Sequence, residues 1–181
     1  MKIRMLNRIL MAGVMVVAAA AASTPNDADL SKSVRHEVLM YSRYTLWDDV
    51  NFRVNNGNVE LLGAVSQPYK KQDLQKIVQS IPGVASVTNE LKVLPLSSFD
   101  DRLRLQVARA IYGDVALSRY GMGAIPSIHT IVDNGHVTLT GAVMTETDKQ
   151  IAGMRAQAAG LSFGSVVNNL SVDQPAKSKK S

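Results

Sequence analysis

The apolar residues of the chain follow a repeating order of helix-like and strand-like spacing. Between residues 27 and 94, helical spacing predicts two amphipathic helices, and alternating spacing predicts a β-hairpin between them. The hairpin turn is Asn56-Gly57, a pair that supplies the two positive-φ positions of a type I′ turn. We expect Gly63 to end the second strand and a last short strand to run from 84 to 93. The predicted order is helix, strand, strand, helix, strand.

The same order recurs in the second half of the chain. Residues 54–65 return as residues 132–143 with most positions identical, so that Gly135 repeats the turn glycine and Gly141 repeats Gly63. A duplicated module is therefore predicted. The expected fold class is α+β, with two tandem α-β-β-α-β modules, each a two-layer sandwich of two helices on a three-stranded sheet.

The repeat also sets the expected domain boundaries. The first module is expected at residues 27–94 and the second at residues 99–173. A signal peptide at 1–22 precedes them, and a basic, disordered tail at 174–181 follows. The linker around Pro95 is short, so we expect the two modules to pack together.

The first residues have the pattern of a secretory signal. Three basic residues precede an uncharged run from Ile9 to Ala22, which is shorter than the roughly 20 residues that span a bilayer. We expect cleavage near Ser23 and release into the periplasm, with an uncleaved membrane anchor as the alternative. Because the chain contains no cysteine, an N-terminal lipid anchor is not expected.

The net charge of +5 is concentrated at the two ends of the chain. The leader and the tail lysines, Lys177, Lys179 and Lys180, account for it, and the part between them is close to neutral. Binding to nucleic acid requires a dense basic face that neutralises many phosphates. No nucleic-acid partner is therefore expected.

Two motifs identify a family resemblance. Residues 59–65 have the pattern V-x-L-x-G-x-V after the Asn-Gly turn, and residues 83–91 have the pattern G-V-x-x-V-x-N-x-L. Together they resemble the BON module of bacterial envelope proteins, although the second copy departs from the pattern at residues 160–163. A signal peptide followed by two such modules is similar to the osmotically inducible periplasmic proteins of Gram-negative bacteria.

This resemblance implies a function without catalysis or cofactors. It implies a periplasmic envelope or stress protein that binds anionic phospholipid surfaces and helps to maintain envelope integrity. The alternative is a protein-interaction or chaperone-like holding factor that binds envelope proteins under osmotic stress. The glycines Gly57, Gly63, Gly135 and Gly141 are interpreted as structural, because glycine is the usual residue where a turn requires positive φ.

The side chains that carry chemistry give no active site. The chain has three histidines, His36, His129 and His136, and we interpret them as surface imidazoles because a metal site needs a third ligand and supporting contacts. Asp48-Asp49 and Asp100-Asp101 are adjacent carboxylates, which often mark loops or helix starts and do not converge as an acid-base pair must. We therefore expect neither an enzyme nor a metal site.

The strongest candidate contact surface is an insertion in the second copy. Residues 118–126 are glycine-rich, apolar and next to a cation, a combination that suits a membrane boundary. We hypothesise a lipid- or partner-facing patch formed by Arg109, Tyr112, Arg119, Tyr120, Met122 and Ile125. The alternative is that these side chains fill the edge of the module beneath the loop. Trp47 is either a further interfacial anchor or packs between the modules, and packing is favoured.

Overall fold

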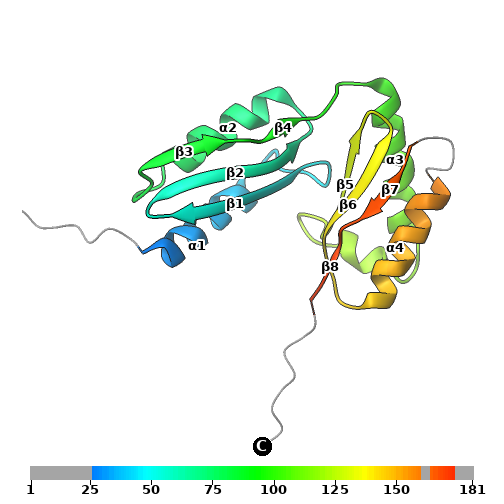
Figure 1. The fold of residues 1–181 in the computed structure, drawn as a ribbon. Helices are drawn as coiled ribbons and strands as arrows, with labels where there is room; N and C mark the ends of the chain where they lie inside the picture. Colours follow the sequence, from blue (N-terminus) through cyan, green and yellow to red (C-terminus); the bar gives the residue numbers. More distant parts are fainter. Residues whose placement is uncertain (1–25, 160–163, 174–181) are drawn as a thin grey trace, which may run out of the picture.

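The computed structural model describes residues 26–159 and 164–173, and two similar α+β modules account for all of them (Figure 1). The signal peptide expected at 1–22, the tail at 174–181 and the departure at 160–163 lie outside the described residues.

The first module contains two helices and one small sheet. Its elements are α1 (Asp27–Met40), β1 (Asp49–Asn55), β2 (Asn58–Val65), α2 (Pro68–Gln79), β3 (Ser86–Asn89) and β4 (Lys92–Val93). Strand β2 lies in the centre, antiparallel to β1 and parallel to β3 and β4. Both helices cover the same face of the sheet, as Figure 1 shows.

The second module repeats this arrangement. Its elements are α3 (Ser98–Tyr112), η1 (Ser118–Gly121), β5 (Ile128–Asp133), β6 (His136–Val143), α4 (Glu146–Ala159), β7 (Val166–Asn168) and β8 (Ser171–Val172). Strand β6 lies between antiparallel β5 and parallel β7 and β8. The predicted fold class, two tandem two-layer α-β-β-α-β modules, is confirmed.

Each module has its own hydrophobic core, built from the residues whose spacing predicted the helices. In the first module Leu30, Val34 and Val38 of α1 are buried against Leu74 and Val78 of α2. The second module buries Leu103, Val107 and Ile111 of α3 in the same way. Burial of these stripes against the sheets supplies the main driving force for folding of a chain that has no disulfides.

Two polar contacts occur in both modules, one at the hairpin turn and one at the motif asparagine. The Asp27 carboxylate accepts the backbone N–H groups of the first hairpin turn at 2.7 and 3.0 Å, and Asp100 does the same at the second turn at 3.0 and 2.9 Å. The motif asparagine Asn89 donates to the Lys71 carbonyl at 2.8 Å, and Asn168 donates to the Lys149 carbonyl at 2.7 Å. These side chains therefore have a structural role.

The last strand of the first module differs from the prediction. The side-chain oxygen of Asn89 accepts the N–H of Leu91 at 3.2 Å, which bends the chain between β3 and β4. The last strand, expected to be continuous from 84 to 93, is therefore split into two short pieces.

The role of the second glycine pair also differs from the prediction. Gly63 and Gly141 do not end their strands, since β2 continues to Val65 and β6 continues to Val143. Both glycines adopt a positive φ inside the strand, at +104° and +103°. A Cβ at Gly63 would lie 2.1 Å from the Asp49 carbonyl oxygen of the neighbouring strand, so only glycine fits there.

The two modules are packed against each other through the edge of β5. The N–H of Thr130 in β5 donates to the carbonyl of Leu46 in the first module at 2.9 Å. Ile131 is buried against Ala64 and Leu94 of the first module, and Lys92 forms an ion pair with Asp133. This contact covers His129 and Ile131, while Ile128 and Val132 of β5 are buried in the second module's own core.

Candidate functional site

The connection between α3 and β5 borders a largely apolar depression on the second module. The connection contains the 3-10 helix η1 and a turn. We call the depression, which has a volume of about 670 Å³, the loop groove. The loop groove is lined by Arg119, Tyr120, Gly123, Ile125, Ser127, Ala142, Val143, Met144, Thr145 and Asp173. This volume and apolar lining are typical of sites that accept a ligand or a partner side chain.

Tyr120 lies at the base of the groove and not on its surface. Its side chain is 7% exposed, its hydroxyl donates to the Asp148 carboxylate at 2.8 Å, and the same hydroxyl accepts the N–H of Met144 at 2.8 Å. Arg119 donates to Asp148 at 2.6 Å and lies over the Tyr120 ring. The position of Tyr120 therefore agrees with the alternative hypothesis, in which this side chain fills the edge of the module beneath the loop.

The Asp148 carboxylate is the polar centre of this region. A hydrogen bond from the Thr145 hydroxyl at 2.6 Å is the largest of several effects that lower the pKa of Asp148. Burial opposes them, and the contacts from Tyr120 and Arg119 add to them. Arg119 therefore has a carboxylate partner within the module, although its side chain is 47% exposed.

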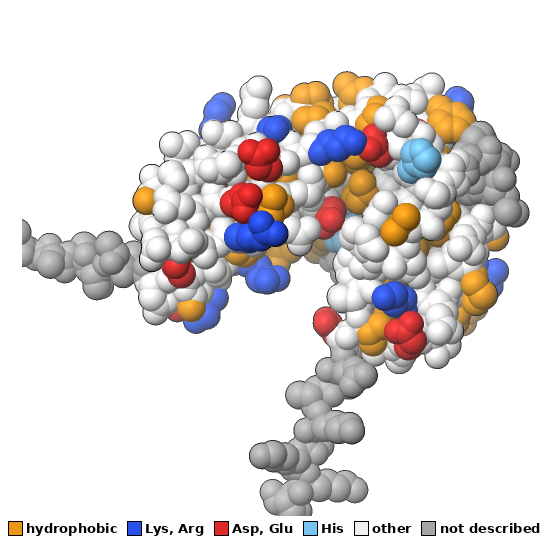
Figure 2. All heavy atoms as spheres, viewed as in Figure 1, with side chains coloured by type: hydrophobic (Ala, Val, Ile, Leu, Met, Phe, Trp, Pro, Cys, Tyr) orange, Lys and Arg blue, Asp and Glu red, His pale blue; other side chains and the backbone are white. Residues whose placement is uncertain are grey.

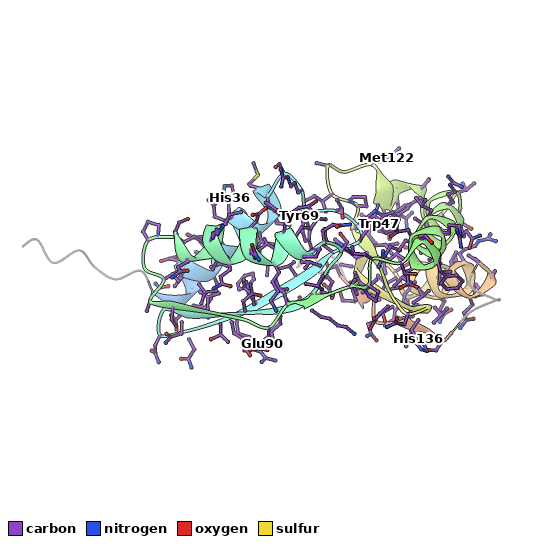
Figure 3. All side chains as sticks on the ribbon, turned by 90° about the horizontal axis from the view of Figure 1, so that it is seen from above. His36, Trp47, Tyr69, Glu90, Met122 and His136 are labelled. Carbon is purple, nitrogen blue, oxygen red and sulfur yellow. The ribbon has the colours of Figure 1, made fainter. Side chains whose placement is uncertain are left out.

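The remaining residues of the hypothesised patch are not brought together into one surface. The Tyr112 hydroxyl donates to the Ile128 carbonyl, and burial raises the pKa of Tyr112 to about 12. Arg109 is exposed but borders a different depression, beside Gly113 and Asp114. Of the apolar side chains in the patch, Ile125 is half-buried in the groove and Met122 projects outward in Figure 3, so these two remain available for contact.

One exposed residue of the same connection was missed by the sequence reasoning. Val115 is 94% exposed and Met122 is 84% exposed, the two highest values among the exposed large hydrophobic residues of the described chain. Val115 lies in the turn after α3, which ends at Tyr112, and the short segment Gly113 to Leu117 has neither helical nor alternating spacing. The connection therefore presents two apolar side chains to solvent.

Trp47 lies where the two modules meet (Figure 3). It is half-buried and lines a cavity of about 260 Å³ with Ser66 and Gln67 of the first module. The opposite wall comes from α3, through Asp101, Arg104 and Leu105. This position agrees with the favoured interpretation, in which Trp47 packs between the modules.

The histidines differ from the prediction at one position. His36 and His136 are exposed, but His129 is only 9% exposed and its ring lies 5.6 Å from that of Tyr44 across the module boundary. The expectation that His129 is a surface imidazole is wrong, because docking of the first module covers β5. Within residues 26–159 and 164–173 no group of three metal-binding side chains converges.

Acidification is expected to weaken the docking of the two modules. Burial lowers the pKa of His129 below its ordinary 6.5, and the nearby carbonyls of Asp48 and Thr45 and the carboxylates of Asp49 and Asp48 only partly oppose this. Because the lowered pKa belongs to the docked state, docking is strongest above pH 6.5 and weakens as the pH falls toward the lowered value, by at most about 1.4 kcal/mol per pH unit.

The fluorescence of Trp47, the single tryptophan, reports on this boundary. Its emission is expected to shift between pH 7.5 and pH 5 in the wild type, while H129Q, whose side chain does not titrate, removes most of the shift. An equal pH dependence in both proteins would contradict this role of His129.

A buried ion pair that the sequence reasoning overlooked supports the first module. The Asp48 carboxylate is 0% exposed and accepts a hydrogen bond from the Lys70 ammonium at 2.6 Å. It also accepts the N–H and hydroxyl groups of Thr45 and Ser66. Burial would raise the pKa of Asp48, but these hydrogen bonds outweigh it and hold the pKa below its ordinary value.

The second module has the opposite charge at the equivalent place. Lys70 is the third residue of α2, and Asp148 is the third residue of α4. Each is buried and paired, Lys70 with Asp48 and Asp148 with Arg119. In each cluster the buried charge has an oppositely charged partner within the module, so both clusters support the fold.

The surface and the helices add two general observations. Figure 2 shows positive and negative side chains interspersed over the visible face, with no extended patch of a single sign. Among the helices of the described residues, none is long and apolar enough to cross a membrane.

Comparison with known proteins gives one family and two remote structural likenesses. The BON domain model matches residues 26–95 and again residues 100–174. No curated protein matches the chain at a significant level.

Two solved structures share 17% and 15% identity with the chain, each with a TM-score of 0.29. The first is CdsD, described as a structural protein of the type III secretion system of Chlamydia trachomatis, and the second is its C-terminal domain. They cover 82% and 80% of this chain, which covers 94% and 98% of theirs. The two family-model matches span nearly all of the described residues, and the chain therefore belongs to the BON domain family, with two tandem copies of the domain.

Proposed function

We propose that this protein is a non-enzymatic periplasmic protein that docks on anionic phospholipid surfaces through the connection between α3 and β5. In this role it helps to maintain the cell envelope under osmotic stress. Membership of the BON family is consistent with an envelope-associated role. The observation that carries the proposal is the exposure of Val115 and Met122, at 94% and 84%, on one short segment.

The physical basis is partial insertion of apolar side chains at the headgroup boundary. Large apolar side chains gain about 1.5–3 kcal/mol each when they leave water completely. Arg109 is exposed near this segment's start, and the tail contributes Lys177, Lys179 and Lys180 for attraction to anionic headgroups. Arg119 contributes less than its position in the sequence indicated, because it is paired with Asp148.

The proposal is tested by co-sedimentation of residues 23–181 with phosphatidylglycerol and with phosphatidylcholine vesicles at low and moderate salt. Selective binding to the anionic vesicles that weakens with salt is expected. The double variant V115D/M122D is expected to bind at least about tenfold more weakly, since it loses two apolar insertions and gains two negative charges.

M40D is the control, because Met40 is 67% exposed on α1 of the first module. It is expected to lose much less binding than the double variant. No binding of the wild-type protein to either vesicle would refute membrane docking and favour the alternative, recognition of envelope proteins. Equal loss in the two variants would contradict the assignment to this segment.

A further inference from the structure

The contact between the two modules uses only half of the surfaces that the duplication provides. The first module contributes the end of β2, the residue after β4 and the loop before β1, and the second module contributes the edge of β5. Because the modules are copies, the second module has a counterpart of the surface through which the first module covers β5. The first module likewise has a counterpart of the β5 edge. In a single chain both of these remain without a module docked on them.

The unused version of the first surface is the loop groove. The repeat aligns Gly63 with Gly141 and Leu91 with Leu170, and therefore Ala64 with Ala142 and Leu94 with Asp173. Ala142 and Asp173 both line the groove. The same alignment places Met144 at the position of Ser66, and these two residues line the corresponding hollows. The groove is thus the counterpart of the surface that covers β5.

The unused edge strand is β1. Thr130, which donates to Leu46 across the module boundary, pairs with Leu139 in its own sheet, and Phe52 pairs with Leu61 in the equivalent register. The main chain of Phe52 therefore points outward at the edge, as that of Thr130 does. Residues 128–132 of β5 are all buried, whereas Asn51, Arg53 and Asn55 of β1 are exposed.

The charges of the two unused surfaces are complementary. In the chain, Ile131 of β5 is buried against Leu94 and Ala64. The equivalent of Ile131 is Arg53, and the equivalent of Leu94 is Asp173. The apolar contact between Ile131 and Leu94 within the chain thus corresponds to a cation on the β1 edge and a carboxylate in the loop groove. The present partner of Arg53 is Glu60 at 3.2 Å, an exposed pair of little energetic weight that can be exchanged.

We propose that the loop groove binds the β1 edge of a second copy of this protein, with Arg53 of one copy facing Asp173 of the next. The contact is head to tail, and it repeats the operation that relates the two modules within the chain. Each added copy leaves one free groove and one free edge, so the assembly grows as an open chain of modules. This inference goes beyond the proposed function and does not depend on lipid.

Sedimentation velocity of residues 23–181, from micromolar to millimolar concentration and without vesicles, tests the proposal. The wild-type mass is expected to rise continuously with concentration. R53D and D173R each place like charges opposite each other, and each is expected to weaken association about tenfold or more. The double variant R53D/D173R restores opposite charges and is expected to recover association.

A control and three outcomes make the test decisive. K76D reverses an exposed charge on α2, away from both surfaces, and is expected to associate as the wild type does. Circular dichroism shows whether each variant is folded. A wild-type monomer at all concentrations, a mass that stops at the dimer, or a double variant no better than the singles would each overturn the proposal.

Discussion

Replacing Gly63 by alanine is expected to lower the free energy of unfolding of the first module by about 3–5 kcal/mol. The added Cβ would lie 2.1 Å from the Asp49 carbonyl oxygen, well inside van der Waals contact, and the φ of +104° is one that L-residues rarely adopt. The two effects act together, because relief of the clash requires β1 and β2 to separate where they are paired through Val50 and Gly63.

Chemical denaturation followed by circular dichroism measures this effect. Gly57→Ala is the graded comparison, since its φ is +77° and its Cβ would lie 3.0 Å from the nearest atom, the Gly83 carbonyl oxygen. It is expected to cost about 1–2 kcal/mol. Gly141→Ala repeats the Gly63 geometry with a contact of 2.0 Å and is expected to have an equally large effect on the second module. Similar losses for Gly57→Ala and Gly63→Ala would show that the close contact is not the cause.

Replacing Lys70 by methionine is expected to destabilise the first module by about 3–5 kcal/mol. The variant keeps most of the apolar volume of the side chain but leaves the Asp48 carboxylate, which is 0% exposed, without its charge partner. The hydrogen bonds from Thr45 and Ser66 remain and do not replace the lost cation.

The pH dependence of stability distinguishes this effect from lost packing. In the wild type the pKa of Asp48 is lowered by folding, so its contribution is complete at neutral pH and is lost as the pH falls through the folded value. Without Lys70, burial raises that pKa, and the variant is expected to gain stability as the pH falls from 7 toward 5.

An exposed ion pair provides the control for this variant. Lys32 and Asp29 on α1 have side chains that are 79% and 59% exposed, and Lys32→Met is expected to cost less than about 1 kcal/mol. A Lys70→Met protein that loses no more stability than Lys32→Met would refute the assigned role of the buried pair.

Much of the fold was determined by the sequence because the relevant interactions are local or periodic. The stripe of Leu30, Val34 and Val38 fixes which face of α1 is buried. The turn residues Asn56 and Asn134 adopt φ values of 49° and 51°, as a type I′ turn requires. Gly57 and Gly135 have the positive φ expected of the turns, but the position of Gly63 inside a strand depends on the neighbouring strand and was not predicted.

The candidate site was predicted only in part, because its geometry depends on contacts between distant residues. The insertion at 118–126 was recognised from the comparison of the two copies, and it does border the loop groove. Its aromatic member, Tyr120, is buried, and its hydroxyl donates a hydrogen bond to Asp148, far along the chain. Val115 gives no periodic signal, and its exposure is known only once the turn after α3 is placed.

The sequence by itself determined that there are two copies of one module, their order of elements and their family. Spacing, turn residues and self-similarity express these properties directly, and each depends on residues near one another in the chain. Only the tertiary structure decided how the copies are packed. Burial of His129, the cavity beside Trp47 and the contact of Ile131 with Leu94 all arise where one module covers the edge strand of the other. No local pattern specifies such a contact, because its free energy comes from surfaces that meet only after both modules have folded.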